Sequence, residues 1–306
     1  RPYSNNLIEE RIMSYRVLTE DQAEQFLDRG YVKIEGCFEK AAIRDWIDLA
    51  FERLGYDPDN PATWEEPRVH LPSMNDMDVA IFAPKAWGAI CDVMGGEERI
   101  KTPVRWRDGF IINFNLGADE PWQPPSPKVK GWHKDGDWFR HFLDSPEQGL
   151  LTVVLWDDVL PQSGGTFIAT DSIGPIARYL VKYPEGLTPR EAQFRKLIDE
   201  CEHCEEATGK AGDVFLLHPY MLHAASQNPS GRARFITNPA VSFKEPMNFN
   251  RENPDDYCLV EQAVLRALDV DRLDFQITRE RELITPERVH RQRRMMEEQK
   301  ARLGIA

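Results

Sequence analysis

Long apolar runs and an excess of positive charge are both missing from this sequence. Its 306 residues contain 51 Asp and Glu against 38 Lys and Arg, which gives a formal net charge of −13. Nucleic acids and anionic membranes attract positively charged surfaces, so we expect neither as a partner. No apolar stretch is long enough to cross a bilayer, and the first residues contain no apolar signal-peptide core.

Cysteine is scarce, and its count is odd. The five residues are Cys37, Cys91, Cys201, Cys204 and Cys258. An odd and mostly dispersed set favours reduced thiols over a disulfide framework, and therefore a cytoplasmic protein. The CxxC formed by Cys201 and Cys204 has no second ligand pair at zinc-site spacing. We interpret it as an exposed acidic helix that carries two cysteines, with a redox pair as the alternative.

The first hundred residues have helical patterns. We expect helices at 19–30, 40–54 and 84–94, separated by a loop at 56–76. Thr19 and Gln22 form a capping-box pair, and Gly30 is a natural terminator for the first helix. Near the end, Thr285 and Pro286 are typical of a helix start, and the arginine-rich stretch that follows is interpreted as a solvated helix face.

From about residue 104 the pattern changes to short β-branched and aromatic segments punctuated by Gly, Pro, Asn and Ser, which is typical of a sandwich or barrel. The expected strands are 104–115, 131–139, 150–156, 165–169, 214–217, 221–226 and 234–243. The prediction is one domain spanning 1–306, mainly β with flanking helices. It has a helical part at about 1–100, a β core at about 101–245 and a helical tail at about 255–306.

A His-x-Asp triplet lies in the segment expected to form the second of these strands. On a strand, residues i and i+2 point to the same face, so His133 and Asp135 would converge on one point. A second histidine from a distant strand would complete a 2-His-1-carboxylate site, which is typical of non-heme Fe(II). The triplet alone is weak evidence, because three-residue patterns arise by chance in long chains.

Two later histidines compete for the third position. His218 and His223 are five residues apart, so an unbroken strand would place them on opposite faces, although Pro219 interrupts that strand. Arg234 follows at a distance from which its rigid guanidinium could pair with a dicarboxylate. We interpret His70, His141, His203 and His290 as surface histidines.

Together these segments resemble the phytanoyl-CoA dioxygenase-like family of iron- and 2-oxoglutarate-dependent oxygenases. The resemblance runs from LTEDQAEQFLDRGYVKIEG through WHKD and LWDDVLPQSGGTFI to GDVFLLHPYMLHAASQNPSGRAR, and so covers most of residues 18–243. It implies a double-stranded β-helix core, that is, a jelly roll of the cupin kind.

The resemblance also assigns roles to individual residues. It implies His133, Asp135 and His223 as metal ligands, Arg234 as the partner of the cosubstrate, Trp156 as a residue packed beside it, and Thr166 as a hydrogen-bond donor to its distal carboxylate. Two positions depart from the common pattern. Ala225 replaces a small hydroxyl residue, and Lys130 replaces a glutamine.

The chemistry implied by the resemblance requires Fe(II), 2-oxoglutarate and O2, and releases succinate and CO2. Hydroxylation of an unactivated C–H bond in a small molecule is the expected reaction, with desaturation, cyclisation or epoxidation left open. Asp135 disfavours halogenation, because related halogenases have a small residue there. Trp138 and Phe139 could line a substrate pocket or belong to the core.

The sequence also leaves open two functions other than an oxygenase. A jelly roll could bind a ligand without turnover, or it could be a cupin-type metal-dependent hydrolase or isomerase that needs neither O2 nor 2-oxoglutarate.

Overall fold

The described residues up to about 100 are mainly helical, although three short strands also lie there. A computed structural model describes residues 15–305. Its first helices are α1 (Glu20–Arg29), α2 (Arg44–Leu54), α3 (Val79–Phe82) and α4 (Pro84–Met94). Thr19 and Gln22 form the expected capping box, with reciprocal bonds of 3.2 and 3.0 Å, and Gly30 ends α1 at φ +68°. Short 3-10 helices occur here and later in the described chain: η1 (Lys40–Ile43), η2 (Pro61–Thr63), η3 (Glu97–Arg99), η4 (Phe194–Glu200) and η5 (Pro254–Asp256).

Antiparallel strands build the remainder of the core. The large sheet has the order β1-β9-β6-β11-β5-β2, with β12 added to β6, and the small sheet has the order β10-β7-β8. The large sheet consists of β1 (Tyr31–Ile34), β2 (Arg68–His70), β5 (Ile111–Asn113), β6 (Leu150–Leu155), β9 (Val214–Leu217), β11 (Arg234–Thr237) and β12 (Ala240–Val241). The other strands are β7 (Thr166–Ala169), β8 (Cys204–Ala207), β10 (Leu222–Ala225) and the pair β3 (Asp76–Asp78) and β4 (Arg105–Arg107).

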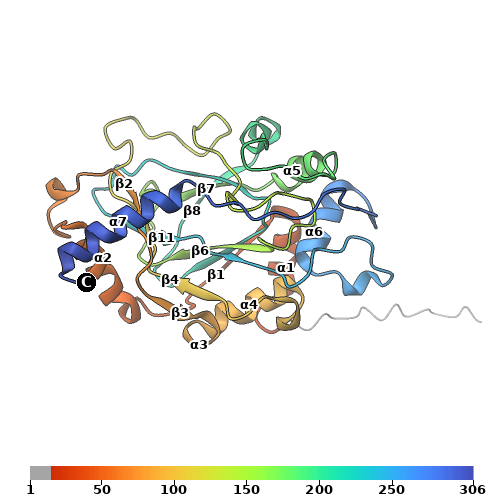
Figure 1. The fold of residues 1–306 in the computed structure, drawn as a ribbon, viewed down its shortest axis with the longest axis horizontal. Coiled ribbons are helices and arrows are strands. Elements are labelled where there is room, and N and C mark those ends of the chain that lie inside the picture. Colours follow the sequence, from red (N-terminus) through yellow and green to blue (C-terminus); the bar gives the residue numbers. More distant parts are fainter. Residues whose placement is uncertain (1–14, 306) are drawn as a thin grey trace, which may run out of the picture.

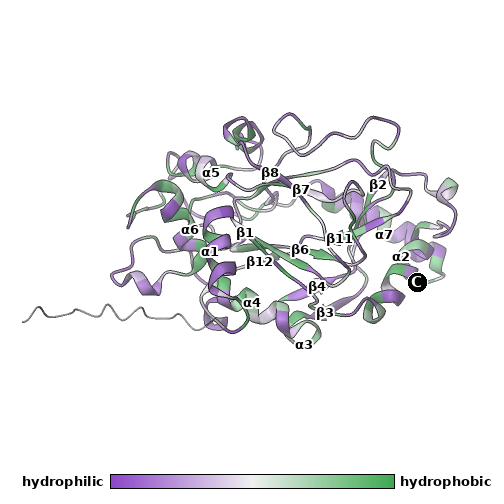
Figure 2. Cartoon of the chain, turned by 180° about the vertical axis from the view of Figure 1, so that it is seen from behind, coloured by the Kyte–Doolittle hydropathy of each residue, from purple (hydrophilic) through white to green (hydrophobic). Residues whose placement is uncertain are grey.

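The two sheets pack face to face and enclose an apolar layer. Leu151, Val153 and Leu155 of β6 point into this layer, where they join Ile168 of the small sheet. The residues between them on β6 point the other way, towards the helices. Figure 2 shows these apolar strands at the centre, surrounded by helices with hydrophilic outer faces. This arrangement confirms the predicted jelly-roll fold with flanking helices.

Helices cover the outer side of the large sheet. α1 and α4 pack on α6 (Leu259–Leu268), which also contacts α5 (Ile173–Leu180). The tail helix α7 (Arg288–Leu303) lies along α2 at the other end of the molecule (Figure 1). Within residues 15–305, no helix combines the length and the apolar character that crossing a membrane requires.

Several local predictions were wrong. Residues 131–139 form turns instead of a strand, with isolated β-bridges from His133 to His223 and from Phe139 to Leu283. Gly136 has φ +120°, a conformation that interrupts a regular strand. β2 lies in the segment expected to be a loop, and β8 begins at Cys204 where a helix was expected. The tail helix was expected to start at Thr285 and Pro286. It begins instead at Arg288, and the residue before it, Glu287, makes no side-chain capping bond.

The cysteines within the described segment are all free thiols. Burial raises the pKa of Cys201 to about 12 and that of Cys204 to about 11. Thiols are the unreactive form, so these two residues have the properties of structural cysteines.

A buried ion pair joins three distant segments near one end of the sandwich. Arg53 of α2 and Asp108 are each 1% exposed, and Arg53 Nη1 lies 3.3 Å from Asp108 Oδ2. Arg53 Nε also donates to Gln299 of α7 at 2.9 Å, and Asp108 Oδ1 accepts from the backbone of Met74 at 2.7 Å. The pair therefore fixes the 72–75 loop, α2 and α7 relative to one another.

We expect Arg53→Met to destabilise the fold by about 3–5 kcal/mol, because the change leaves the Asp108 carboxylate buried without its cation. Urea unfolding measures the difference. Arg44→Met, an exposed position on the same helix, should change stability by less than about 0.5 kcal/mol. Equal stability of the two variants would contradict this role for the pair.

His218 is a buried part of the core. Its Nδ1 accepts from Tyr220 N at 3.1 Å, and its Nε2 lies 3.2 Å from the Val260 carbonyl of α6. Burial lowers its pKa to about 3, so the folded protein holds it neutral. Below about pH 6.5 the imidazole of His218 binds a proton in the unfolded chain but stays neutral in the folded chain. The stabilisation that comes from the neutral, buried His218 is therefore complete above pH 6.5 and is lost as the pH falls towards 3.

His218→Asn retains a hydrogen-bond acceptor but cannot titrate. We therefore expect the free energy of unfolding of this variant to fall less steeply between pH 6 and pH 4, by up to about 1.4 kcal/mol per pH unit. Urea unfolding at a series of pH values tests this. Parallel curves for the variant and the native protein would show that His218 is not the titrating group.

Candidate metal centre

Two histidines from distant segments are held together through their backbones. His133 N donates to His223 O at 3.0 Å, and His223 N donates to His133 O at 2.9 Å. Their ring centroids are 4.3 Å apart. His223 lies on β10, whose pairing with β7 directs it into the layer between the sheets, next to Ile168. One small bridge thus brings together residues that are ninety positions apart.

Asp135 completes the cluster. Its Oδ1 lies 3.5 Å from His133 Nε2, and its Oδ2 lies 3.5 Å from His223 Nε2. Burial alone would raise the pKa of Asp135, but His223 and His133 outweigh it and hold this pKa well below the usual value. Asn238 Nδ2 donates to Asp135 Oδ2 at 2.6 Å and so fixes the carboxylate.

The donor atoms of this cluster fit a divalent metal. His133 Nδ1 lies 2.8 Å from the Gly131 carbonyl, and His223 Nδ1 lies 3.1 Å from the Met221 carbonyl. Both Nδ1 atoms therefore act as donors, which leaves a lone pair on each Nε2. The buried His223 Nε2 has no hydrogen-bond partner within residues 15–305. One potential ligand atom from each of the three residues lies within 4.8 Å of the others, an arrangement that could hold a metal.

A small cavity adjoins the triad and ends at Arg234. Its walls include His133, His223, Thr166 and Arg234. Arg234 Nε donates to the Gly164 carbonyl at 2.7 Å, and Nη1 donates to the Ile111 carbonyl at 3.2 Å. A side chain at Gly164 (φ +82°) would approach Asn113 to within 2.8 Å, so this close turn requires glycine.

Arg234 differs from the other buried arginines in having no carboxylate partner. Arg53 pairs with Asp108, and Arg140 pairs with Glu191 and Glu282. Arg234 is 2% exposed, and no acidic group within the described part of the chain forms an ion pair with it. Burial, and then the charge of Arg68, lower the pKa of Arg234 to about 9. A buried, unpaired cation is costly, and an anionic ligand would neutralise it.

The other predicted site residues are divided between the cavities and the core. Thr166 borders the cavity beside Arg234, and Trp138 borders a wider opening outside the triad. Phe139 is fully buried and borders neither space. Trp156 also borders neither space. Its neighbour Leu155 points into the layer between the sheets, so Trp156 points to the opposite side, towards the helices, where its ring centroid lies 5.1 Å from that of Phe38.

The histidines expected at the surface include one core residue. His141 is 2% exposed and stacks against Phe139 and Phe194, so its surface assignment was wrong. Its Nδ1 lies 3.3 Å from Lys134 Nζ, and burial followed by this ammonium group holds the pKa of His141 well below its usual value. His218, the competitor of His223, lies in the core and is not part of the cluster.

Sequence reasoning missed two residues near the triad. Asn238 follows β11 and holds Asp135, and Arg68 of β2 borders both the cavity and the wider opening. Arg68 pairs in register with Asn113, which also pairs with Arg234. The register places the three side chains on one face of the sheet. No local pattern reveals this, because β2 lies in a polar segment without clear alternation.

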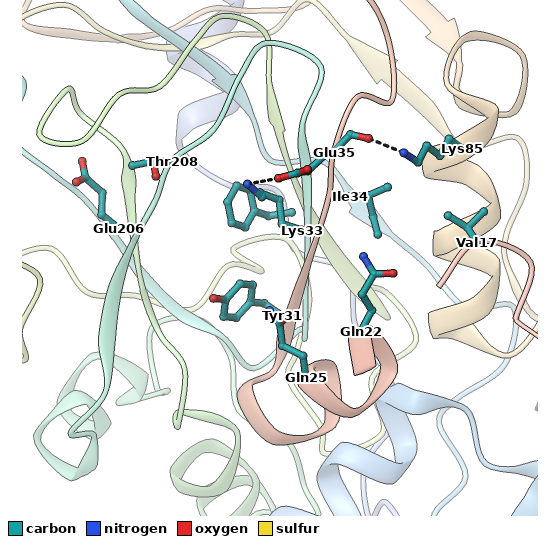
Figure 3. Close-up of a pocket in the computed structure, with 11 residues that line it drawn as sticks. Val17, Gln22, Gln25, Tyr31, Lys33, Ile34, Glu35, Lys85, Glu206 and Thr208 are labelled. Atoms are coloured by element: carbon teal, nitrogen blue, oxygen red, sulfur yellow. Dashed lines mark hydrogen bonds and ion pairs between the residues drawn. The ribbon is translucent and has the colours of Figure 1, made fainter. Parts of the chain in front are cut away.

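A second pocket lies beside β1, the edge strand of the large sheet, away from the triad (Figure 3). Its charged groups already satisfy one another. Lys33 lies 2.8 Å from a Glu35 carboxylate oxygen, and Lys85 donates to the Glu35 carbonyl at 2.7 Å. Within the described residues, the cluster able to hold a metal is elsewhere, so this pocket offers no comparable chemistry.

Comparisons with known proteins agree with the predicted family. The sequence profile of phytanoyl-CoA dioxygenase (PhyH) matches residues 26–236, more than half of the chain. A comparison with curated proteins finds no match.

Several solved structures are similar to the chain at low sequence identity. The epimerase SnoN, in complex with Fe3+, α-ketoglutarate and nogalamycin RO, is 16% identical, with a TM-score of 0.45 over 88% of this chain and 96% of that one. EctD from S. alaskensis, with 2-oxoglutarate and 5-hydroxyectoine, is 16% identical, with a TM-score of 0.40 over 79% and 78%. HygX from Streptomyces hygroscopicus, with nickel, 2-oxoglutarate and hygromycin B, is 16% identical, with a TM-score of 0.41 over 74% and 87%.

The profile match covers the triad residues and Arg234, and it agrees with the resemblance first seen in the sequence. The chain belongs to the phytanoyl-CoA dioxygenase family of iron- and 2-oxoglutarate-dependent enzymes.

Proposed function

We propose that this protein is a dioxygenase that hydroxylates an unactivated C–H bond of a small molecule and releases succinate and CO2. The observation that carries the proposal is the buried, unpaired Arg234, which borders the same cavity as the His133–Asp135–His223 cluster. A metal site alone would also suit a hydrolase or a binding protein. An anion site beside the metal calls for a charged cosubstrate such as 2-oxoglutarate.

In this proposal His133 Nε2, Asp135 and His223 Nε2 hold Fe(II). The bound iron and 2-oxoglutarate together supply the oxidising power by activating O2. The protein orients these groups: the Gly131 and Met221 carbonyls fix the two imidazole rings, and Asn238 fixes the carboxylate. Three protein ligands leave positions open for the cosubstrate and O2.

Arg234 and Thr166 would bind the far carboxylate of 2-oxoglutarate. Arg234 Nη2 makes no hydrogen bond within residues 15–305, although Nε and Nη1 are both used, so it remains available to an anion. The apolar side chains of Val153 and Ile236 line the same cavity and would exclude water from the ion pair. The Gly164 and Ile111 carbonyls hold the guanidinium in place before the cosubstrate binds.

Asp135 also supports hydroxylation over halogenation. A halogenase needs space for a halide beside its metal, and here the Asp135 carboxylate occupies that side of the cluster. The remaining side of the cluster opens outward, because His133 has a 46% exposed side chain whereas His223 is buried. A substrate can therefore approach from the opening that Trp138 borders.

Asp135→Ala should abolish 2-oxoglutarate-dependent succinate formation, because the metal loses its only anionic protein ligand. Succinate release and the iron content per chain are the measurements. Asp157→Ala, which removes a carboxylate paired with Lys40, serves as the control and should retain both. Undiminished succinate formation by Asp135→Ala would sink the ligand assignment.

Arg234→Ala should raise the KM for 2-oxoglutarate at least about tenfold, since charge-assisted hydrogen bonds to a carboxylate contribute about 1.5–3 kcal/mol. The primary-substrate requirement should change far less. Arg232→Ala is the matched control, because Arg232 lies two residues away in an exposed turn. A selective loss of primary-substrate affinity in Arg234→Ala would show that the carboxylate partner is assigned wrongly.

A further inference from the structure

The opening outside the triad is a basic cavity in an acidic protein. It has a volume of about 680 Å³, a size suited to a small-molecule substrate. β2, β4, the 133–138 segment and the start of α7 form its walls. Its cationic side chains are Arg68, Arg105, Arg107, Arg288 and Lys134, and its carboxylates are Asp135 and Asp137. The chain as a whole has a net charge of −13, so this local excess of cations is opposite in sign to the rest of the protein.

Some of these cations already have partners. Arg105 Nε donates to Asp76 at 2.7 Å, and Arg288 binds both oxygens of Asp137 at 2.6 and 2.9 Å. The side chains of Arg68 and Arg107 make no hydrogen bond or ion pair with any residue from 15 to 305, although their backbones pair within β2 and β4. Two guanidinium groups therefore face the cavity with their donors unused.

The proposed cosubstrate does not neutralise these two arginines. Fe(II) and Arg234 would together balance the charges of Asp135 and of the 2-oxoglutarate dianion. Arg68 and Arg107 form no ion pair among residues 15–305, although Asp76 lies opposite Arg107 in the β3–β4 register and also binds Arg105. Burial, and then the charges of Arg288 and Arg68, lower the pKa of His70 in the same cavity to about 4, so His70 is neutral at pH 7 and does not contribute to this charge.

The two arginines occupy different depths. Arg68 borders both the inner cavity and the opening, because its register with Asn113 and Arg234 places it on the inner face of the large sheet. Arg107 borders the opening alone. Trp106, its neighbour on β4, is fully buried on the other side of the strand, which leaves Arg107 directed outward.

We propose that the primary substrate carries an anionic group, a carboxylate or a phosphate, and that Arg107 and Arg68 bind it at the opening. This inference rests on the proposed function, because it takes the triad as the reaction centre. The two arginines would hold the anionic end, and an uncharged part of the substrate would lie nearer the metal. Arg107 would act on the substrate alone, whereas Arg68 would also affect 2-oxoglutarate.

The test measures binding without turnover. The Fe(II)- and 2-oxoglutarate-loaded protein is titrated calorimetrically under anaerobic conditions with hexanoate, hexyl phosphate, 1-hexanol and hexylamine. We expect at least one of the two anions to bind with a Kd at least tenfold lower than that of hexanol or hexylamine. Whichever anion binds more tightly identifies the group as carboxylate or phosphate. Its Kd should rise with salt, as for any solvent-accessible charge pair.

Variants locate the interaction. Arg107→Gln should raise the Kd of the preferred anion at least tenfold while leaving that of 2-oxoglutarate unchanged, and Arg68→Gln should raise both. Arg44→Gln, which removes an exposed arginine on α2 with no partner among the described residues, should leave both within twofold. This control corrects for the change in net charge.

The inference is overturned if hexanol or hexylamine binds as tightly as the anions, if none of the four probes binds, or if Arg107→Gln binds the anion unchanged. Failure of the proposed function gives a different result. The loaded protein would then form no succinate under O2, whatever the anaerobic titrations report.

Discussion

The antiparallel bridge between His133 and His223 is the contact on which the site depends. Its two backbone hydrogen bonds join the 131–139 segment to β10 and place the two candidate ligand histidines side by side. The carbonyls of Gly131 and Met221 then orient the rings, and Asn238 orients Asp135. The sandwich supplies the rigid support, because β10 pairs with β7 and packs against the large sheet. A metal would therefore meet ligands that are already placed.

The pairing of buried arginines with carboxylates is the second constraint on the site. The described chain neutralises the buried Arg53 and Arg140 with carboxylates, yet leaves Arg234 unpaired beside the triad. A fold can carry such a cost where a ligand offsets it. Arg68 and Arg107 in the wider opening are exposed, so water solvates them and they carry no such burial cost, but their guanidinium groups remain available to an anion. The inner cation suits a cosubstrate, and the outer pair suits an anionic substrate.

Much of the fold could be predicted from local sequence patterns, because capping residues and apolar alternation act over short distances. α4 and β9 have the predicted bounds, and the capping box of α1 forms as expected. Strand geometry predicted that His133 and Asp135 converge, and the family resemblance supplied His223. The 131–139 segment is not a strand but a series of turns, with His133 held by an isolated bridge to His223, so the convergence of His133 and Asp135 has a different cause. Trp156 was expected beside the cosubstrate. It faces the helices because Leu155 occupies the inward position of β6. Arg68 and Asn238 could not be predicted, since their roles depend on strand pairing and long-range contacts.

A crystal structure of the protein prepared anaerobically with Fe(II) and 2-oxoglutarate tests the central claim most directly. The account predicts one iron about 2.1 Å from His133 Nε2, an Asp135 oxygen and His223 Nε2. It also predicts a 2-oxoglutarate molecule whose far carboxylate contacts Arg234 Nη2. Iron bound elsewhere in the chain, or a cosubstrate whose far carboxylate points away from Arg234, would contradict it.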